Sequence, residues 1–278
     1  MTENNLELQL EKKCSIETLD SLPDNYVSSA KQSISNVSSG VPEFWQNKYT
    51  KEASKNWDKF YKRNGNRFYK DRHWTTREFP ELLSLNGKTI LEIGCGVGNF
   101  ILPIMNEFQL AKVYACDFAN SAIDILKENE LYRNGNDENR LAFVANIVED
   151  NLLETISADS VDIVSSVFVF SALNPDSMKK AIKNIYNILK PGGIILFRDY
   201  ARYDAAQLRF NSNNKINDNF YVRQDGTFAY YFERDELQSL FHECGFKCQY
   251  SDYVLRKTTN HKQQMNLDRI FLQAKFIK

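Results

Sequence analysis

Apolar residues recur with two different spacings along the chain, and the two alternate from about residue 88 onward. The short apolar runs typical of buried strands are Thr89–Ile93, Val113–Cys116, Leu141–Ala145, Val161–Phe170, Ile194–Phe197, Phe246–Arg256 and Asp268–Phe276. The segments with helical spacing are Lys51–Arg63, Ser121–Glu128, Asp176–Leu189 and Glu233–Cys244. This alternation predicts a doubly wound α/β domain with a mostly parallel sheet and helices on both faces.

Three glycines stand between the first predicted strand and the segment that follows it. Gly94, Gly96 and Gly98 let the backbone turn sharply and approach a ligand, which predicts a nucleotide-like cofactor at the carboxyl end of the sheet. A dinucleotide fingerprint requires a third glycine where this chain has Asn99. The pattern here is G-x-G-x-G, with the acid Glu92 two residues before it.

A second acid, Asp117, ends the second predicted strand, 19 residues after Gly98. An acid at this place can accept hydrogen bonds from both ribose hydroxyls of an adenosine. The alternative is an ordinary glycine turn, with Asp117 capping the next helix. Together with Glu92, the glycine turn resembles the first motif of class I methyltransferases. That resemblance implies S-adenosyl-L-methionine as cofactor and a Rossmann-like, seven-stranded, mostly parallel sheet.

Net charge and cysteine usage indicate which partners and which cell compartment to expect. The formal net charge of −1 predicts neither a nucleic-acid nor a membrane partner. No apolar run approaches the length of a membrane span, and the N-terminus lacks the features of a signal peptide. Cys244 and Cys248 lie near His242, but the remaining ligands of a zinc site are missing, so we expect no metal. Reduced thiols indicate a cytoplasmic protein, with the nucleus as a second compartment.

The chain divides into three regions. Residues 1–45 are polar, with few periodic apolar positions, and we expect a largely disordered arm. Residues 46–84 form a basic segment rich in aromatic side chains, and residues 85–278 form the catalytic domain. Within that domain, residues 200–231 are an insertion after the fifth strand. Its place at the carboxyl edge of the sheet predicts a role in choosing the substrate.

The basic segment runs against the average charge of the chain. From Lys48 to Arg77 there are ten lysines or arginines and three acids, giving a net charge of +7, with aromatic side chains between them. Charge for phosphates beside rings for unstacked bases is what binding of single-stranded or looped RNA requires. The alternative is a helix that packs its rings on the domain and leaves its lysines in solvent. The residues expected to contact RNA are Lys59, Lys62, Arg63, Lys70, Arg72, His73, Trp74, Arg77, Arg209 and Arg223.

Five blocks of sequence carry a more specific resemblance. They are Asn56–Asn64, Phe68–Phe79, Glu92–Asn99, Phe197–Tyr200 and Phe220–Thr227. They resemble the methyltransferase-like enzymes that form 3-methylcytidine in tRNA, and most of all the branch that acts on serine tRNAs. The resemblance implies methylation of cytidine 32 in the anticodon loop, with seryl-tRNA synthetase as a helper. We expect a monomer that does not bind membranes.

The resemblance also assigns cofactor contacts. They fall on Trp57, Tyr61, Gly94, Asp117, Ile147 and Val167, to which the motif adds Glu92, Gly96 and Gly98. After the third strand, where the family commonly has an acid to hold the adenine amino group, this chain has Asn146. Its side-chain oxygen can still accept that hydrogen bond, but without the help of a negative charge.

The expected chemistry requires little acid–base work. Cytosine N3 has a free lone pair, so its attack on a sulfonium methyl group needs positioning and not a general base. The product ring is cationic, and a carboxylate would stabilise it. Asp199 is the candidate, with Arg198 and Tyr200 shaping the pocket. The alternative is a structural Arg198–Asp199 ion pair.

Two other functions share part of this pattern. A small-molecule methyltransferase would have the glycine turn but would not need the basic aromatic segment. A non-catalytic RNA-binding subunit would need that segment but not an intact cofactor motif. Both features are present in this chain, which favours an RNA methyltransferase.

Overall fold

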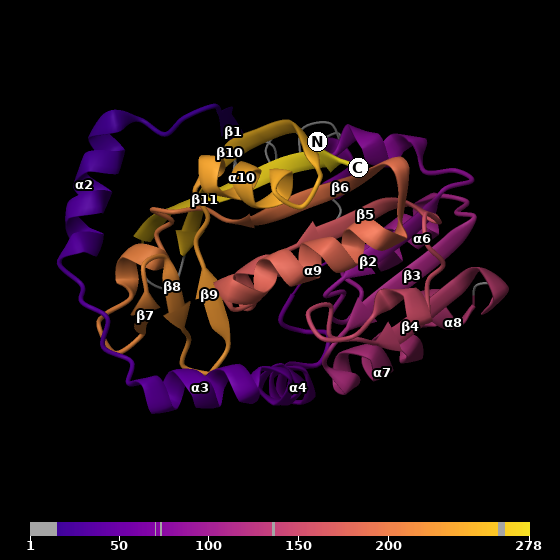
Figure 1. Ribbon diagram of the computed structural model, residues 1–278, viewed down its shortest axis with the longest axis horizontal. Helices are drawn as coiled ribbons and strands as arrows, with labels where there is room; N and C mark the ends of the chain where they lie inside the picture. The colour runs from indigo at the N-terminus through magenta and orange to yellow at the C-terminus, as the bar shows by residue number, and fades with distance from the viewer. Residues whose placement is uncertain (1–15, 70, 73, 135–136, 261–264) are drawn as a thin grey trace, which may run out of the picture.

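The computed structural model describes residues 16–69, 71–72, 74–134, 137–260 and 265–278. Its centre is an eight-stranded sheet in the order β1-β10-β11-β6-β5-β2-β3-β4 (Figure 1). The strands are β1 (Ile16–Leu19), β2 (Thr89–Ile93), β3 (Lys112–Asp117), β4 (Arg140–Val144), β5 (Val161–Val167), β6 (Leu189–Tyr200), β10 (Lys247–Asn260) and β11 (Met265–Ile277). Strands β2 to β6 are parallel, and β11 is antiparallel to both of its neighbours. The predicted Rossmann-like sheet is confirmed, with β1 as an additional edge strand.

Helices cover both faces of this sheet (Figure 1). The described part of the chain contains helices α2 (Asp24–Ser35), α3 (Glu43–Lys51), α4 (Ala53–Asn64), α5 (Thr75–Glu78), α6 (Ile101–Glu107), α7 (Asn120–Glu128), α8 (Glu130–Arg133), α9 (Pro175–Ile188) and α10 (Arg234–His242). Short 3-10 turns occupy Pro80–Ser84, Asp137–Asn139, Leu152–Glu154, Phe170–Ala172 and Gln207–Arg209. In the described part of the chain, no helix has the length and apolar character needed to cross a membrane.

Helix α9 shows how local sequence fixes an element. The Asn174 side chain accepts a hydrogen bond from the N–H of Asp176 at 3.1 Å, and Pro175 occupies the first helical position. The buried side chains on one face of the helix are Met178, Ala181, Ile182, Ile185 and Ile188. Their spacing of three and four residues places them on one stripe against the sheet.

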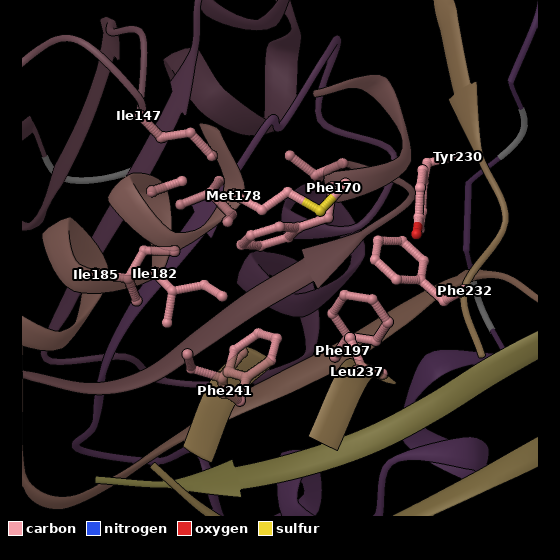
Figure 2. Close-up of a cluster of buried hydrophobic side chains, with 14 of the residues drawn as sticks. Ile147, Phe170, Met178, Ile182, Ile185, Phe197, Tyr230, Phe232, Leu237 and Phe241 are labelled. Carbon is pink, nitrogen blue, oxygen red and sulfur yellow. The ribbon is translucent and has the colours of Figure 1, made fainter. Parts of the chain in front are cut away.

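The main core forms where this stripe meets aromatic rings. Figure 2 shows side chains of α9 pointing toward Phe170, Phe197 and Phe241. Phe241 of α10 stacks on Phe276 of β11 with ring centroids 3.9 Å apart. Burying one such ring fully contributes roughly 1.5–3 kcal/mol. The core therefore holds α9, α10 and the centre of the sheet together, behind the carboxyl ends of the strands.

The N-terminal arm differs from the expectation. Residues 16–45 form β1, α2 and the start of α3, so the prediction of a largely disordered arm is wrong there, while residues 1–15 lie outside the described part. Tyr26 donates its hydroxyl to the main-chain oxygen of Tyr203 at 2.8 Å, and Lys215 Nζ donates to that of Val37 at 2.8 Å. These partners lie almost 180 residues away along the chain, so the arm is ordered by contacts that no local pattern reveals.

The insertion after β6 forms a second sheet. Its strands are β7 (Lys215–Asn217), β8 (Phe220–Val222) and β9 (Phe228–Tyr230), paired in the order β7-β8-β9. The rings of Tyr230 and Phe232 lie 4.8 Å apart within the main core, which joins the end of the insertion to the domain. The other end of the β8–β9 hairpin lies against α3 (Figure 1).

Candidate functional site

The glycine turn and Asp117 form one hydrogen-bonded unit. Asp117 accepts hydrogen bonds from the N–H groups of Gly96 and Ala119, each at 2.9 Å. Gly96 has a φ of +53°, and a Cβ added there would lie 2.5 Å from the hydroxyl oxygen of Tyr61. Burial raises the pKa of Asp117 to about 6, although its main-chain partners oppose that shift. The two hydrogen bonds leave lone pairs on the carboxylate for a ligand.

A cavity with about 490 Å³ of empty space, part of it open to solvent, lies beside this unit at the carboxyl ends of β2, β3, β4 and β5. Its lining includes six predicted cofactor contacts: Trp57, Tyr61, Gly94, Asp117, Asn146 and Ile147. The lining residues that the sequence reasoning missed are Phe118, Ala145, Phe168, Val169, Ala172 and Leu173. They all lie just beyond the ends of β3, β4 and β5. Their position directly after the predicted strands could have identified them from the sequence.

Helix α4 forms one wall of the cavity with Trp57 and Tyr61. The Ser121 N–H donates to the Asp58 carboxylate at 2.9 Å, which fixes α4 against the start of α7. Ser54 adds a hydrogen bond from its hydroxyl to the main-chain oxygen of Phe118 at 2.9 Å. The hydrogen bond from Lys62 is the main reason that the pKa of Asp58 falls to about 2. A helix that precedes the first parallel strand along the chain therefore completes the cavity.

Four predicted cofactor contacts lie around the cavity without lining it. Glu92 is buried beneath the glycine turn and accepts the Ile101 N–H at 3.1 Å, at the start of α6. Burial raises the pKa of Glu92 to about 8. Gly98 packs against leucine side chains, Val167 is buried at the end of β5, and Gly96 meets Tyr61 as described above. These residues shape the turn and the strand ends that carry the lining residues.

Asn146 uses its side chain in its own loop. Its Oδ1 accepts the Val148 N–H at 3.0 Å, and its main-chain N–H donates to Asp150 at 2.8 Å. A carbonyl oxygen has a second lone pair, so Asn146 can still accept one more hydrogen bond. The expected contact with an adenine amino group stays a prediction.

Arg198 and Asp199 point to opposite faces of β6. Arg198 is 1% exposed and forms an ion pair with Glu78 of α5, and its guanidinium lies 4.6 Å from the Trp74 ring centroid. The alternative of an Arg198–Asp199 ion pair is therefore wrong, because neighbouring strand residues alternate between faces. Asp199 accepts the N–H groups of Ser171 and Tyr200, each at 2.9 Å.

Asp199 supports the loop that lines the cavity and is not itself part of the lining. It is fully buried, and burial raises its pKa to about 6. Its partner Ser171 lies in the loop between Phe168 and Leu173, which borders the cavity. The catalytic role expected for Asp199 stays a prediction, and the contacts observed here are those of a loop support.

Tyr200 links the cavity to the insertion. Its ring lies 5.1 Å from the ring of Phe168, which lines the cavity, and 5.7 Å from that of Tyr231. The guanidinium groups of Arg223 and Arg269 lie 5.5 and 5.7 Å from the Tyr200 ring centroid. A ligand that leaves the cavity on this side therefore meets aromatic faces and positive charge.

A wide basic groove lies between α4 and the insertion, with about 1690 Å³ of empty space, part of it open to solvent. Four predicted RNA contacts line it: Lys59, Arg63, Arg209 and Arg223. The remaining lining residues are Asn56, Phe60, Asn64, Phe68, Ala206, Phe210, Asn211, Asn214, Gln224 and Asp225. Asp225 is the single acid among the described residues of this lining. The predicted charge and rings therefore converge in one groove.

The other predicted RNA contacts do not line the groove. Lys62 is exposed and pairs with Asp58 at 2.7 Å, whereas Arg77 is exposed beside Glu78. Arg72 and Trp74 are half-buried, and Arg72 Nη1 donates to the main-chain oxygen of Val167 at 3.2 Å. For these residues the alternative applies, in which the segment packs on the domain and leaves its other basic side chains in solvent. Lys70 and His73 lie outside the described residues.

Comparisons with known proteins agree with this architecture. A family model for a methyltransferase domain matches residues 61–251. Human tRNA N(3)-cytidine methyltransferase METTL6 is 47% identical over 243 residues, which cover 86% of this chain and 84% of the human protein. The Schizosaccharomyces pombe tRNA N(3)-methylcytidine methyltransferase trm141 is 41% identical over 243 residues, covering 85% and 96%.

A likeness to solved structures supports the fold. A SAM-dependent methyltransferase from Methanosarcina mazei has a TM-score of 0.54 and 17% identity, over 75% of this chain and 98% of that one. The match to these curated relatives extends over 85 to 86% of the chain. The protein therefore belongs to the family of tRNA N(3)-cytidine methyltransferases.

Proposed function

We propose that this protein transfers a methyl group from S-adenosylmethionine to N3 of a cytidine in tRNA. The observation that carries the proposal is that one helix, α4, borders both the cavity beside Asp117 and the basic groove. A small-molecule enzyme has no use for the groove, and a non-catalytic RNA-binding subunit has no use for the cavity. The names of the curated relatives support the same reaction.

The cavity has the features that this cofactor requires. The backbone at Gly94 and Gly96 leaves space that a Cβ would fill, because added atoms would lie 2.8 Å from Val169 and 2.5 Å from Tyr61. The free lone pairs of Asp117 would accept the ribose hydroxyls. Asn146 and Ile147 would hold the adenine, and Trp57 and Tyr61 would cover the cofactor. The cofactor supplies an electrophilic methyl group.

The reaction asks the protein for positioning. Cytosine N3 presents a lone pair and carries no proton to remove, so no general base is required. The chain must hold the base in line with the methyl group and exclude water. Phe168 and Tyr200 lie at the border of the cavity, and their rings also provide aromatic faces for the positive charge that develops on the base. Asp199 remains the candidate carboxylate for the same charge.

The substrate region is proposed to be the anticodon loop. A base inside a helix cannot reach the cavity, so the target must be unpaired and turned outward. The groove supplies Lys59, Arg63 and Arg209 for phosphates and the half-exposed ring of Phe68 for stacking. From the resemblance in sequence we propose serine tRNAs and position 32. We also propose a monomer, in the cytoplasm and nucleus, with seryl-tRNA synthetase as helper.

Purified protein, methyl-labelled cofactor and an unmodified serine tRNA transcript test the proposal. Nuclease digestion and mass spectrometry should find 3-methylcytidine, and a transcript with uridine at position 32 should accept no label. Adding seryl-tRNA synthetase should raise the rate. Label appearing at another position would contradict the proposed site, and the absence of label with the synthetase present would contradict the proposed substrate. Fractionation of cells tests the proposed compartments.

A further inference from the structure

Helix α4 contacts the insertion through one buried amide. Asn56 is 9% exposed, and its Nδ2 donates to the main-chain oxygen of Gly226 at 3.1 Å. Gly226 lies in the β8–β9 turn with a φ of +79°, and an added Cβ would lie 2.7 Å from that Nδ2. The same Cβ would lie 3.5 Å from the ring of Tyr49 in α3. The turn therefore packs tightly on α3 and α4, consistent with its place in Figure 1.

Trp57, the residue next to Asn56, belongs to the cofactor cavity. Trp57 and Tyr61 line the cofactor cavity, whereas Asn56 lines the groove, so consecutive residues of one helical turn serve both. Hydrogen bonds from Ser54 and to Asp58 fasten α4 to the loop after β3 and the start of α7. A ligand that fixes the cavity wall therefore also fixes the donor that holds the turn.

The β8–β9 turn that Asn56 holds fixes the position of Arg223. The Arg223 N–H donates to the main-chain oxygen of Thr227 at 2.8 Å, and the Gly226 N–H donates to that of Arg223 at 3.0 Å. Arg223 Nη1 donates to the main-chain oxygen of Phe228 at 2.7 Å, and its guanidinium lies 5.5 Å from the Tyr200 ring centroid. The guanidinium is thus fixed to the turn, and it moves when the turn moves.

We infer that Asn56 is a positioning residue that couples cofactor binding to RNA binding through the Asn56–Gly226 hydrogen bond. Cofactor packed against Trp57 and Tyr61 holds α4, and α4 holds the β8–β9 turn so that Arg223 faces the groove and Tyr200. The inference rests on the proposed function, since it requires both ligands, and it goes further by making their binding interdependent.

The coupling acts in both directions. A ligand that orders α4 lowers the conformational entropy that is lost when the second ligand binds. Each ligand therefore raises the affinity of the protein for the other. Linkage requires the two effects to be equal. Because coupling of this kind typically changes affinity by about 5- to 150-fold, we expect bound cofactor to tighten RNA binding at least about fivefold.

Fluorescence anisotropy with a labelled serine tRNA transcript measures the coupling. The dissociation constant is determined with and without saturating S-adenosylhomocysteine, and the ratio of the two is the coupling factor. In the wild-type protein the factor should be at least about five. In Asn56→Leu, which keeps the branching of the side chain and removes the donor, it should fall to about one. A wild-type factor of one, or a wild-type factor retained by Asn56→Leu, overturns the inference.

Asn214→Leu is the matched control. The Nδ2 of Asn214 donates to the main-chain oxygen of Val222 at 2.9 Å, so it supports the same hairpin through a hydrogen bond that does not involve α4. This variant is expected to bind RNA less tightly but to keep the wild-type coupling factor. If both variants lose coupling equally, general loosening of the insertion explains the effect and the assignment to Asn56 fails.

Hydrogen exchange of the wild-type protein tests the inference without a variant. S-adenosylhomocysteine should slow exchange at the amides of Arg223 and Gly226, although neither residue lines the cofactor cavity. Unchanged exchange there overturns the inference even if Asn56→Leu fails to fold. If either ligand fails to bind at all, the proposed function fails. If both bind independently, the proposed function stands and the coupling fails.

Discussion

Asp117 accepts a hydrogen bond from the N–H of Gly96 at 2.9 Å, so the acid at the end of β3 holds the glycine turn at the end of β2. The two residues lie 21 positions apart along the chain, and the strands whose ends carry them, β2 and β3, are adjacent in the sheet. One carboxylate therefore fixes the shape of the turn and presents its remaining lone pairs to the cavity.

Replacing Asp117 by Ala should nearly abolish cofactor binding. Two hydrogen bonds from ribose hydroxyls to a charged acceptor are worth ~1.5–3 kcal/mol each, so affinity should fall at least about 100-fold. Calorimetry with S-adenosylhomocysteine measures the loss. Asp150→Ala is a suitable control, because Asp150 supports the Asn146 main chain at 2.8 Å but does not line the cavity. Equal affinity in Asp117→Ala and the wild type would remove this assignment.

Cofactor affinity should depend on pH through the same carboxyl group. Burial raises the pKa of Asp117 to about 6, and the ionised form is the better acceptor for ribose hydroxyls. Affinity should therefore be constant above about pH 7 and fall as the pH drops through 6, by roughly tenfold per unit once the group is protonated. Calorimetry between pH 5 and pH 8 tests this, and Asp117→Asn should show no such decline. A decline of the same size in Asp117→Asn would assign the pH dependence to another group.

Glu92 should make the fold less stable as the pH rises. Its pKa is raised by burial to about 8, so the folded protein holds a proton that the unfolded chain releases near pH 4.5. Stability is greatest at low pH for this group and falls by about 1.4 kcal/mol per unit between about pH 4.5 and pH 8. Glu92→Gln mimics the protonated form and can still accept the Ile101 N–H. In thermal melts, the melting temperature of the variant should rise relative to that of the wild type as the pH rises. The same difference in melting temperature at all pH values would contradict this.

Basic residues inside the groove should matter more for RNA binding than those outside it. Replacing Lys59, Arg63 and Arg209 by Ala should weaken tRNA binding and reduce its salt dependence by roughly 0.7–0.9 log unit per lost phosphate contact. The matched control is Lys62→Ala with Arg77→Ala, because both side chains are exposed but do not line the groove. Binding isotherms at several salt concentrations give the slopes. Equal losses in the two variants would show that the groove is not the RNA path.

Sequence patterns predicted β2, β3 and β4 to within one residue at each end, because each is a short apolar run between breaks, but they did not predict β1, β7, β8 or β9. The run from Val161 shows where such patterns stop being informative. It was expected to continue to Phe170, but β5 ends at Val167, and Phe168 turns the chain with a φ of +62°. Few residues other than glycine adopt this conformation, so nothing local announces a turn at a phenylalanine. That turn directs Phe168 and Val169 to the cavity, and both were missed.

The pairing of charged groups is the other feature that the sequence patterns did not predict. Arg198 and Asp199 are adjacent in sequence, and an ion pair between them was a natural alternative. The partner of Arg198 is Glu78, 120 residues away, and the partners of Asp199 are main-chain N–H groups. Which charges meet is decided by the packing of α5 on β6, which depends on the whole fold. Local spacing can therefore identify candidate residues for a site, but it cannot assign their partners.

The role of Asp199 can be decided by Asp199→Asn. Each carboxylate oxygen accepts one main-chain N–H, from Ser171 and from Tyr200. An asparagine has only one acceptor oxygen, and its amide group would place a donor against the other N–H. The loop that begins at Phe168 should then shift, so we expect a lower melting temperature and weaker cofactor binding. An unsatisfied buried N–H costs about 1–3 kcal/mol.

A catalytic Asp199 would behave differently. If its charge stabilised the cationic base, loss of the charge would slow methyl transfer by about 10²–10³, while cofactor and tRNA would bind normally. Single-turnover rates at saturating enzyme and cofactor, measured beside thermal melts and calorimetry, separate the two outcomes. A loop support predicts that saturating cofactor restores most of the single-turnover rate, because bound ligand holds the loop in place. A rate that stays low at saturation, with an unchanged melting temperature, would establish the catalytic role instead.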